Sequence, residues 1–253
     1  MTKRFHLAAF LEGSSTALGF LTILPIPADP GFHNNALTRA LPWFPWVGLV
    51  VGAAAAAAAL LLGRVFSPLT AAVLSTAVWA LITGGLHLDG LADCCDGLLV
   101  SAPRERRLEI MKDPRLGGFG AIGLFLFLLL KVAALQTVIE FSAWRVILLA
   151  AAAGRSAVYL ALSQPSARQG GLGAQVRSGV SWAGILFGLL PLVGLVVWLG
   201  WPGLGAAAAG GLICGGALWL ARNRIGGVTG DVHGMIIELV EMVVLLVYPL
   251  LSV

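Results

Sequence analysis

The sequence predicts an all-α integral membrane protein: a polytopic helical bundle of about seven transmembrane helices, preceded by an N-terminal interfacial or re-entrant helix. Hydrophobic residues make up 58% of the 253 residues and charged residues only 11%, whereas charged residues make up roughly 25% of a soluble domain. The apolar residues are gathered in several runs of about 20, the length that crosses a bilayer core. Residues 1–253 are therefore expected to form a single transmembrane domain.

Seven apolar segments are long enough to cross a hydrocarbon core of about 30 Å at about 1.5 Å of rise per residue. These predicted spans are 43–62, 68–86, 118–135, 144–162, 180–200, 202–220 and 232–253. An eighth apolar stretch, 7–26, contains Glu12 and ends among prolines. We expect it to be an interfacial or re-entrant helix, and whether it crosses the membrane is left open.

Basic residues are distributed unequally between the two sides of this predicted bundle. One side carries only Arg64 and Arg145, while Lys131 and Arg155 fall within spans. The other side carries Lys3, Arg4, Arg39, Arg104, Arg106, Arg107, Lys112, Arg115, Arg168, Arg177, Arg222 and Arg224. Because loops rich in Lys and Arg stay in the cytoplasm, this second side is predicted to be cytoplasmic.

Composition and cysteine spacing give no support to nucleic-acid binding, to a disulfide framework or to a zinc site. The net charge of +4 is too small to indicate nucleic-acid binding. Cys94, Cys95 and Cys214 show neither a CxxC pair nor a Cys/His spacing, so neither a disulfide framework nor a zinc site is indicated.

The stretch TGGLHLDGLADCCDGLL, residues 83–99, gathers acidic residues at the end of an apolar segment. On a helix, Asp89, Asp93 and Asp96 share one face, and His87 points to roughly the opposite side. Three carboxylates at a membrane interface repel one another and lose hydration. A solvated helix end would explain one such aspartate, but three on one face favour a hard divalent cation bound by oxygen ligands.

A second stretch, RERRLEIMKDPRLGGFG, covers residues 104–120. Its first half is expected to be an exposed amphipathic helix with a solvated charged face. In its second half, Lys112, Asp113 and Arg115 precede a glycine-rich entry into the next span. Cations beside backbone amides at a helix N-terminus suit phosphate oxygens.

A third stretch, RIGGVTGDVHGMIIELVE, covers residues 224–241. Gly227 and Gly230 can open a loop whose amides face an anion. Asp231 and Glu238 lie seven apart on one helical face, and Glu238 lies one turn inside an apolar span, where an acid is a functional candidate. Asp231 alone could also be satisfied by the helix dipole. Arg155, among alanines, either pairs with one acid or holds a diphosphate inside the bundle.

In this order and spacing, the three stretches closely resemble the cobalamin synthase family, the adenosylcobinamide-GDP ribazoletransferases. The matching segments are GGLHLDGLAD..DG at 84–97, LEIMKDPRLGGFG at 108–120, GGVTGD at 226–231 and ARQGGLG at 167–173. Ile23 stands where the family often has a basic residue, Pro114 replaces a usual serine, and Cys94-Cys95 replaces small or hydroxyl residues. Every acidic position is intact.

The resemblance implies a magnesium-dependent enzyme in the bacterial cytoplasmic (inner) membrane, with its active site facing the cytoplasm. It would transfer the adenosylcobinamide phosphate moiety of adenosylcobinamide-GDP to α-ribazole or α-ribazole 5′-phosphate, releasing GMP late in cobalamin biosynthesis. Its partners would be these substrates and the lipid bilayer; the acceptor used and a homo-oligomeric state are left open.

With this resemblance, we assign three groups of site residues. The expected Mg²⁺ ligands are Asp89, Asp93, Asp96 and Asp231. The expected substrate-binding residues are Lys112, Arg155, Arg168, Gly227 and Gly230. The expected catalytic residues are Arg115, which would stabilise developing charge, and Asp113, Glu238 or, less favoured, His87 as the base.

Two other functions are compatible with acidic residues in a membrane protein. A CDP-alcohol-type phosphotransferase also places spaced aspartates at a helix end with Mg²⁺, but its DGxxAR spacing is absent, since Cys94 follows Asp93. An ion-coupled transporter could use Asp89, Asp93, Glu238 and Arg155. Its acids should lie near the membrane midplane, whereas most of these are expected at one interface.

Overall fold

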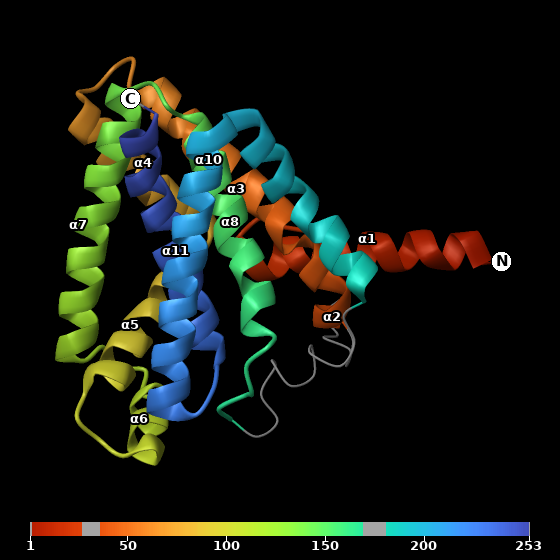
Figure 1. The fold of residues 1–253 in the computed structure, drawn as a ribbon, viewed down its shortest axis with the longest axis vertical. Coiled ribbons are helices and arrows are strands. Elements are labelled where there is room, and N and C mark those ends of the chain that lie inside the picture. The colour runs from red at the N-terminus through yellow and green to blue at the C-terminus, as the bar shows by residue number, and fades with distance from the viewer. Residues whose placement is uncertain (1, 27–35, 169–180, 253) are drawn as a thin grey trace.

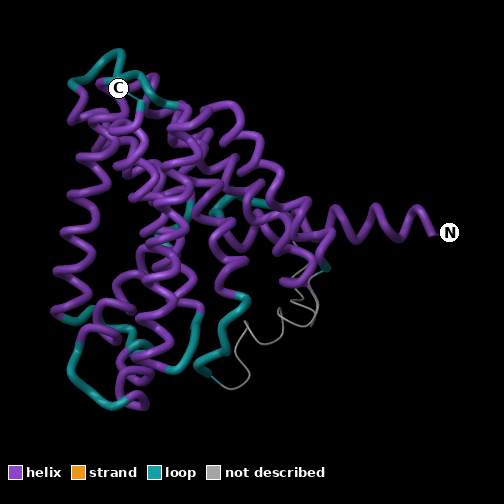
Figure 2. Tube along the Cα trace, in the orientation of Figure 1, coloured by secondary structure: helices purple, strands orange, loops and turns teal. Residues whose placement is uncertain are grey.

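The computed structural model describes residues 2–26, 36–168 and 181–252. Within these ranges every regular element is a helix, and a single isolated bridge joins Ser166 and Val228 (Figure 2). The α-helices are α1 (Thr2–Leu21), α2 (Ala36–Ala40), α3 (Phe44–Leu62), α4 (Pro68–Ile82), α5 (Leu86–Leu99), α6 (Arg104–Ile110), α7 (Gly118–Glu140), α8 (Arg145–Ala161), α10 (Trp182–Ile225) and α11 (Gly230–Leu251). The all-α prediction is confirmed.

Most described residues of the seven predicted spans are helical, but seven transmembrane helices are not confirmed. By length and composition, four helical stretches of the described chain can cross a membrane, or five if α4 and α5 count as one broken span. These four are residues 36–62 with α3, and the helices α7, α10 and α11. Helix α8 has 17 residues and falls short of that length.

The predicted span 68–86 is wrong at its end, because α4 stops at Ile82. Gly84 and Gly85 have φ angles of +60° and +69°, a backbone conformation that side chains with a Cβ rarely adopt. They turn the chain by 93° between α4 and α5. This turn swings the acidic segment out of line with α4.

Helix α10 is divided at Gly200, whose φ of 66° and ψ of −148° are not helical. Figure 1 shows its first limb rising to the upper end of the bundle and its second limb returning beside α11. This break lies at the boundary predicted between the spans 180–200 and 202–220. Helix α1 instead projects sideways from the bundle (Figure 1).

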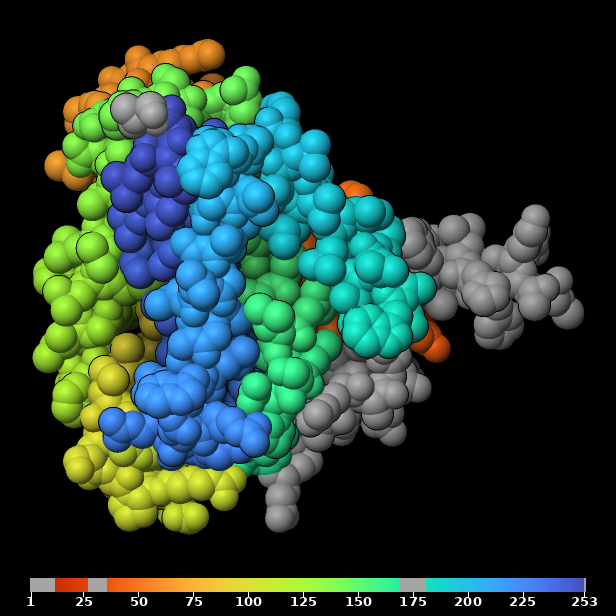
Figure 3. Space-filling view, viewed as in Figure 1, coloured from red at the N-terminus to blue at the C-terminus, as the bar shows by residue number. Residues whose placement is uncertain are grey.

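The two ends of the bundle differ in charge. At one end, Arg64 lies in a pocket with residues of the α7–α8 connection. At the other, Arg104 donates hydrogen bonds to the carbonyl oxygens of Ile225 and Ala167, at 2.7 and 3.1 Å. Helices α5 and α6 form this second end (Figure 3). The acidic stretch and the basic loops therefore meet at the same end of the molecule.

Candidate active site

The site is built where α5 crosses α11. A Cβ on Gly90 would lie 2.8 Å from the carbonyl oxygen of Asp231, and a Cβ on Gly234 would lie 3.2 Å from the backbone of His87. Glycine at both positions lets the two backbones come closer than side chains would allow. This crossing brings the aspartates of α5 beside the first turn of α11.

Three carboxylates converge at this crossing. Asp93 lies within electrostatic range of Asp89 and Asp231, and Arg168 is the cation that acts on it. Arg168 Nη2 lies 3.1 Å from Asp231 Oδ2, and Thr229 Oγ1 donates to the same oxygen at 3.1 Å. Asp89 and Asp93, from the predicted shared face of α5, therefore form one acidic cluster with Asp231 of α11.

Asp96, also predicted to bind metal, has another partner. Its Oδ2 accepts a hydrogen bond from the Gly117 amide and its Oδ1 accepts one from the Gly120 amide, both at 2.8 Å. These amides belong to the open first turn of α7, where a carboxylate is stabilised by donors and by the helix dipole. Asp96 thus joins α5 to α7, and the structure gives it a structural role that the spacing alone did not suggest.

Within the described residues, no three His, Cys, Asp or Glu side chains are close enough to form a metal site by themselves. Magnesium does not require such a cage. It keeps several waters and is usually bound by one or two carboxylates together with substrate phosphates. The carboxylates of Asp89, Asp93 and Asp231 supply the oxygen donors that Mg²⁺ prefers.

The KDPR segment, residues 112–115, is connected to this cluster by Arg168 and to α5 by Asp96. At its start, Arg168 Nη2 approaches the Met111 carbonyl at 3.4 Å, and at its end Asp96 holds the amides of 117 and 120. Lys112 is exposed and follows Met111 directly. Arg168 and Asp96 therefore connect the two ends of this segment to α11 and to α5.

Asp113 and Arg115 bind each other in this segment. Arg115 donates from Nε to Oδ1 at 2.9 Å and from Nη2 to Oδ2 at 2.6 Å, and its side chain is 86% exposed. These hydrogen bonds lower the pKa of Asp113 to about 2. A carboxylate with so low a pKa is a weak base, so the structure does not support Asp113 as the proton acceptor.

The expectation that 104–110 is a solvated helix is wrong for Arg107. Its side chain is buried and donates to the carbonyl oxygens of Ala102, Gly97 and Leu98 at 2.8, 3.1 and 2.7 Å. Arg107 therefore satisfies carbonyl groups that the end of α5 leaves without helical partners. Helix α6 stabilises the acidic helix.

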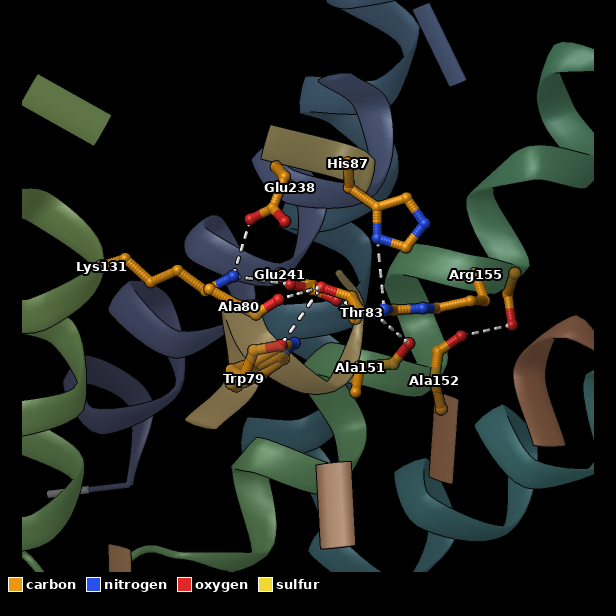
Figure 4. A network of polar contacts seen from close by, with 11 residues as sticks. Trp79, Ala80, Thr83, His87, Lys131, Ala151, Ala152, Arg155, Glu238 and Glu241 are labelled. Carbon is orange, nitrogen blue, oxygen red and sulfur yellow. Dashed lines mark hydrogen bonds and ion pairs between the residues drawn. The ribbon is translucent and has the colours of Figure 1, made fainter. Parts of the chain in front are cut away.

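Glu238 belongs to a buried ionic network (Figure 4). Lys131 Nζ of α7 lies 2.6 Å from Glu238 Oε2 and 2.8 Å from Glu241 Oε2, and 4.4 Å from the centroid of Trp79. Arg155 of α8 forms an ion pair with Glu241. Two cations thus balance two acids, as buried charges require.

This network bears on two predicted site residues. Arg155 has no exposed surface, so in this conformation it contacts Glu241 and not a diphosphate. Glu238 is 2% exposed and paired with Lys131, a position that gives no support to its role as the base. Glu241, which the sequence interpretation did not single out, could have been found as a second acid inside an apolar span.

The glycine-rich loop before α11 is held by backbone pairing. Val228 donates to the Pro165 carbonyl and accepts from the Ala167 amide, both at 2.9 Å, and a Cβ on Gly227 would overlap the Pro165 carbonyl. Gly230 begins α11. The Val228 amide therefore bonds within the protein, and the loop brings Arg168 to Asp231.

A cavity of about 300 Å³ lies beside the acidic cluster, between α1, α2, α3, α5, α8 and α11. Asp89, Asp231 and the rings of His87 and His233 form its polar wall. The other wall is apolar and includes the stacked rings of Phe20 and Phe44, with centroids 6.0 Å apart. His233, which the sequence interpretation did not select, donates from Nδ1 to the Thr229 carbonyl oxygen at 2.7 Å.

With this fold and site, the chain is a helical membrane protein with an acidic cluster at one end of its bundle. Comparison with known families defines it further. The sequence model of the cobalamin-5-phosphate synthase family matches residues 13–249. The chain therefore belongs to the cobalamin-5-phosphate synthase family.

Individual relatives agree with this assignment. The chain is 40% identical over 233 residues to a protein of Geotalea daltonii, covering 91% of this chain and 94% of the relative. It is 42% identical over 240 residues to a protein of Pseudomonas entomophila, covering 90% and 95%. Both relatives are named adenosylcobinamide-GDP ribazoletransferase. No solved structure matches the chain.

Proposed function

We propose that this protein is an adenosylcobinamide-GDP ribazoletransferase. It transfers the adenosylcobinamide phosphate moiety to α-ribazole or its 5′-phosphate and releases GMP, late in cobalamin biosynthesis. The observation that best supports this proposal is the crossing of α5 and α11 in a chain of this family. This crossing brings Asp89, Asp93 and Asp231 together at the end of the bundle that is rich in basic residues. Neither a transporter nor a CDP-alcohol-type phosphotransferase is supported by the relatives.

The acidic cluster would hold Mg²⁺. Carboxylate oxygens and substrate phosphates are the ligands that this ion prefers. Asp89, Asp93 and Asp231 lie near one another, whereas both carboxylate oxygens of Asp96 accept hydrogen bonds from backbone amides. When bound, the ion would neutralise charge on the diphosphate. Asp96 keeps α7 and the KDPR segment in place beside it.

The reaction is a substitution at phosphorus. A hydroxyl oxygen of the acceptor bonds to the phosphorus nearer the cobinamide and its proton passes to water. The bond from that phosphorus to the bridging oxygen breaks, and GMP leaves with the electron pair. In such transfers, positioning and charge stabilisation account for most of the rate enhancement. Lys112 and Arg115 are exposed cations that would stabilise charge on the GDP portion, and Arg168 binds Asp231.

The site is proposed to face the cytoplasm across the inner membrane. Arg104, Arg106 and Arg107 of α6, together with Arg168, lie at the α5–α6 end, whereas Arg64 follows α3 and Arg145 begins α8 at the other end. This asymmetry is the pattern of a cytoplasmic side.

Turnover by the purified protein tests this proposal. The chain in lipid nanodiscs is incubated with adenosylcobinamide-GDP and α-ribazole, with Mg²⁺ or with a chelator, and the products are separated by chromatography. We expect equal amounts of adenosylcobalamin and GMP with Mg²⁺ and neither with the chelator. Absence of both products with Mg²⁺ would overturn the function, and undiminished turnover with the chelator would overturn the metal requirement.

A further inference from the structure

Helix α6 carries three arginines with different partners. Arg106 forms an exposed ion pair with Glu109 at 3.0 Å, within the helix itself. Arg107 is buried against the end of α5. Arg104 instead contacts two segments that lie 63 and 121 residues away in the chain, although the sequence predicted a solvated face here. Arg104 therefore connects parts of the fold that the sequence separates, and no step of the proposed reaction uses it.

Arg104 joins the end of α10 to the segment that precedes Arg168. Its Nε donates to the Ile225 carbonyl oxygen at 2.7 Å, and its Nη2 donates to the Ala167 carbonyl oxygen at 3.1 Å. Ile225 is the last residue of α10, and the carbonyl groups of a helix end lack helical partners. Gly226 follows with a φ of 80°, and a Cβ there would lie 3.1 Å from Arg104 Nε. Glycine thus leaves room for the guanidinium over this turn.

Arg168, the residue after Ala167, reaches the acidic cluster. Its Nη2 lies 3.1 Å from Asp231 Oδ2 and 3.4 Å from the Met111 carbonyl oxygen. Its own carbonyl oxygen accepts a hydrogen bond from Ser166 Oγ at 2.7 Å. The place of the Arg168 guanidinium therefore depends on where the backbone of 166–168 is held, and Arg104 is one of the groups that hold it.

Helix α6 thereby connects the two helices that supply the carboxylates. Figure 1 shows it near the lower ends of α5 and α11. Arg107 binds the carbonyl groups at the end of α5, and Arg104 binds the segment whose Arg168 contacts Asp231 of α11. A displacement of α6 would therefore change the position of Asp231 relative to the aspartates of α5.

We propose that Arg104 is a positioning residue of the acidic cluster, acting through Arg168 to hold Asp231 in place for Mg²⁺. This inference rests on the proposed function and adds a residue to its metal site. Loss of an outer hydrogen-bond partner of a metal ligand typically weakens metal binding by about 10–100-fold. Arg168 and Thr229 are such partners of Asp231. The hydrogen bonds of Arg104 go to backbone carbonyl oxygens, so its effect must pass through Arg168.

Hydrogen–deuterium exchange tests the first step without metal or turnover. The Ala167 amide donates to the Val228 carbonyl oxygen and the Val228 amide to that of Pro165, both at 2.9 Å. Arg104→Ala should speed exchange of these two amides by about five-fold or more, the effect of losing roughly one hydrogen bond. Arg106→Ala, which removes the neighbouring exposed arginine, should leave it unchanged. Equal exchange in wild type and Arg104→Ala would overturn the proposal.

Binding of Mn²⁺ tests the second step. Mn²⁺ takes carboxylate oxygens as Mg²⁺ does, and EPR measures the free ion beside the purified chain in nanodiscs, without substrate. We expect Arg168→Ala to bind Mn²⁺ about ten-fold more weakly, and Arg104→Ala to show a smaller loss in the same direction. The double variant should bind no more weakly than Arg168→Ala alone. Losses that multiply in the double variant would show independent action and overturn the proposal.

A conservative variant separates positioning from general stability. Arg104→Lys keeps the charge and one donor for the two carbonyl oxygens, so its Mn²⁺ affinity should lie between those of wild type and Arg104→Ala. It also carries the comparison if Arg104→Ala folds poorly, which its Tm reveals. A wild-type chain that binds no Mn²⁺ would overturn this inference. Because exchange and Mn²⁺ binding use no substrate, GMP release by the wild type still decides the proposed function separately.

Discussion

Asp93 and Asp96 are both acids of α5, but the structure surrounds them differently. Asp96 accepts from two backbone amides, whereas Asp93 faces other carboxylates. Asp96→Asn removes a charged acceptor from the start of α7, which should cost about 1–3 kcal/mol. We expect a lower Tm but an unchanged Mg²⁺ concentration for half-maximal turnover.

The matched control is Glu105→Gln, which removes an exposed carboxylate at the same end of the molecule and should change neither quantity. If Asp96→Asn raises the Mg²⁺ requirement and leaves the Tm unchanged, the carboxylate is a metal ligand and its capping role is secondary.

The buried network gives a second prediction at this scale. Lys131→Met leaves Glu238 and Glu241 with one cation between them, and removing one partner of a buried ion pair costs about 3–5 kcal/mol. Lys131→Met combined with Glu238→Gln leaves the Arg155–Glu241 pair balanced. We expect the double variant to have a higher Tm than Lys131→Met alone. A Tm lowered by the sum of both single effects would contradict the charge balance.

At the scale of the elements, the crossing of α5 and α11 determines the geometry of the site. A Cβ on Gly90 would meet a backbone oxygen at 2.8 Å, and one on Gly234 would meet backbone atoms at 3.2 Å. Gly90→Ala must therefore separate the helices more than Gly234→Ala does, at a cost of about 1–3 kcal/mol for such overpacking.

We expect turnover to decrease in the order Gly211→Ala, Gly234→Ala, Gly90→Ala, with the first equal to wild type because its Cβ would lie in open space. Steady-state rates in nanodiscs measure this order. Equal turnover in Gly90→Ala and Gly211→Ala would show that close approach of the two helices is not needed.

The sequence was sufficient to predict α5 and the shared face of its aspartates, because spacing along one helix is a local property. It could not predict that Asp96 caps α7, since the partners are 21 and 24 residues away. Nor could it pair Lys131 with acids 107 and 110 residues away. Periodicity describes each helix alone, whereas these contacts depend on how helices pack. The turn at Gly84-Gly85 was missed because an apolar run continued through it.

At the scale of the whole molecule, the account predicts which end faces the cytoplasm. In a background without native cysteines, Ser101→Cys lies at the α5–α6 end and Arg64→Cys at the opposite end, and both positions are exposed. A membrane-impermeant maleimide added to intact cells should label Arg64→Cys and not Ser101→Cys. Labelling of both after cell lysis shows that each thiol is reactive, and the reverse pattern in intact cells would contradict the orientation.

The dependence of turnover on Mg²⁺ in Asp93→Asn and Asp231→Asn tests the central claim most directly, because the claim requires an acid from each of two helices. Purified wild-type and variant proteins in nanodiscs are assayed for GMP release across a Mg²⁺ titration. The account predicts saturable turnover for wild type and a loss of about 10²-fold or more in each variant, the scale of removing a group that stabilises developing charge. Wild-type turnover with an unchanged Mg²⁺ dependence in either variant would contradict it.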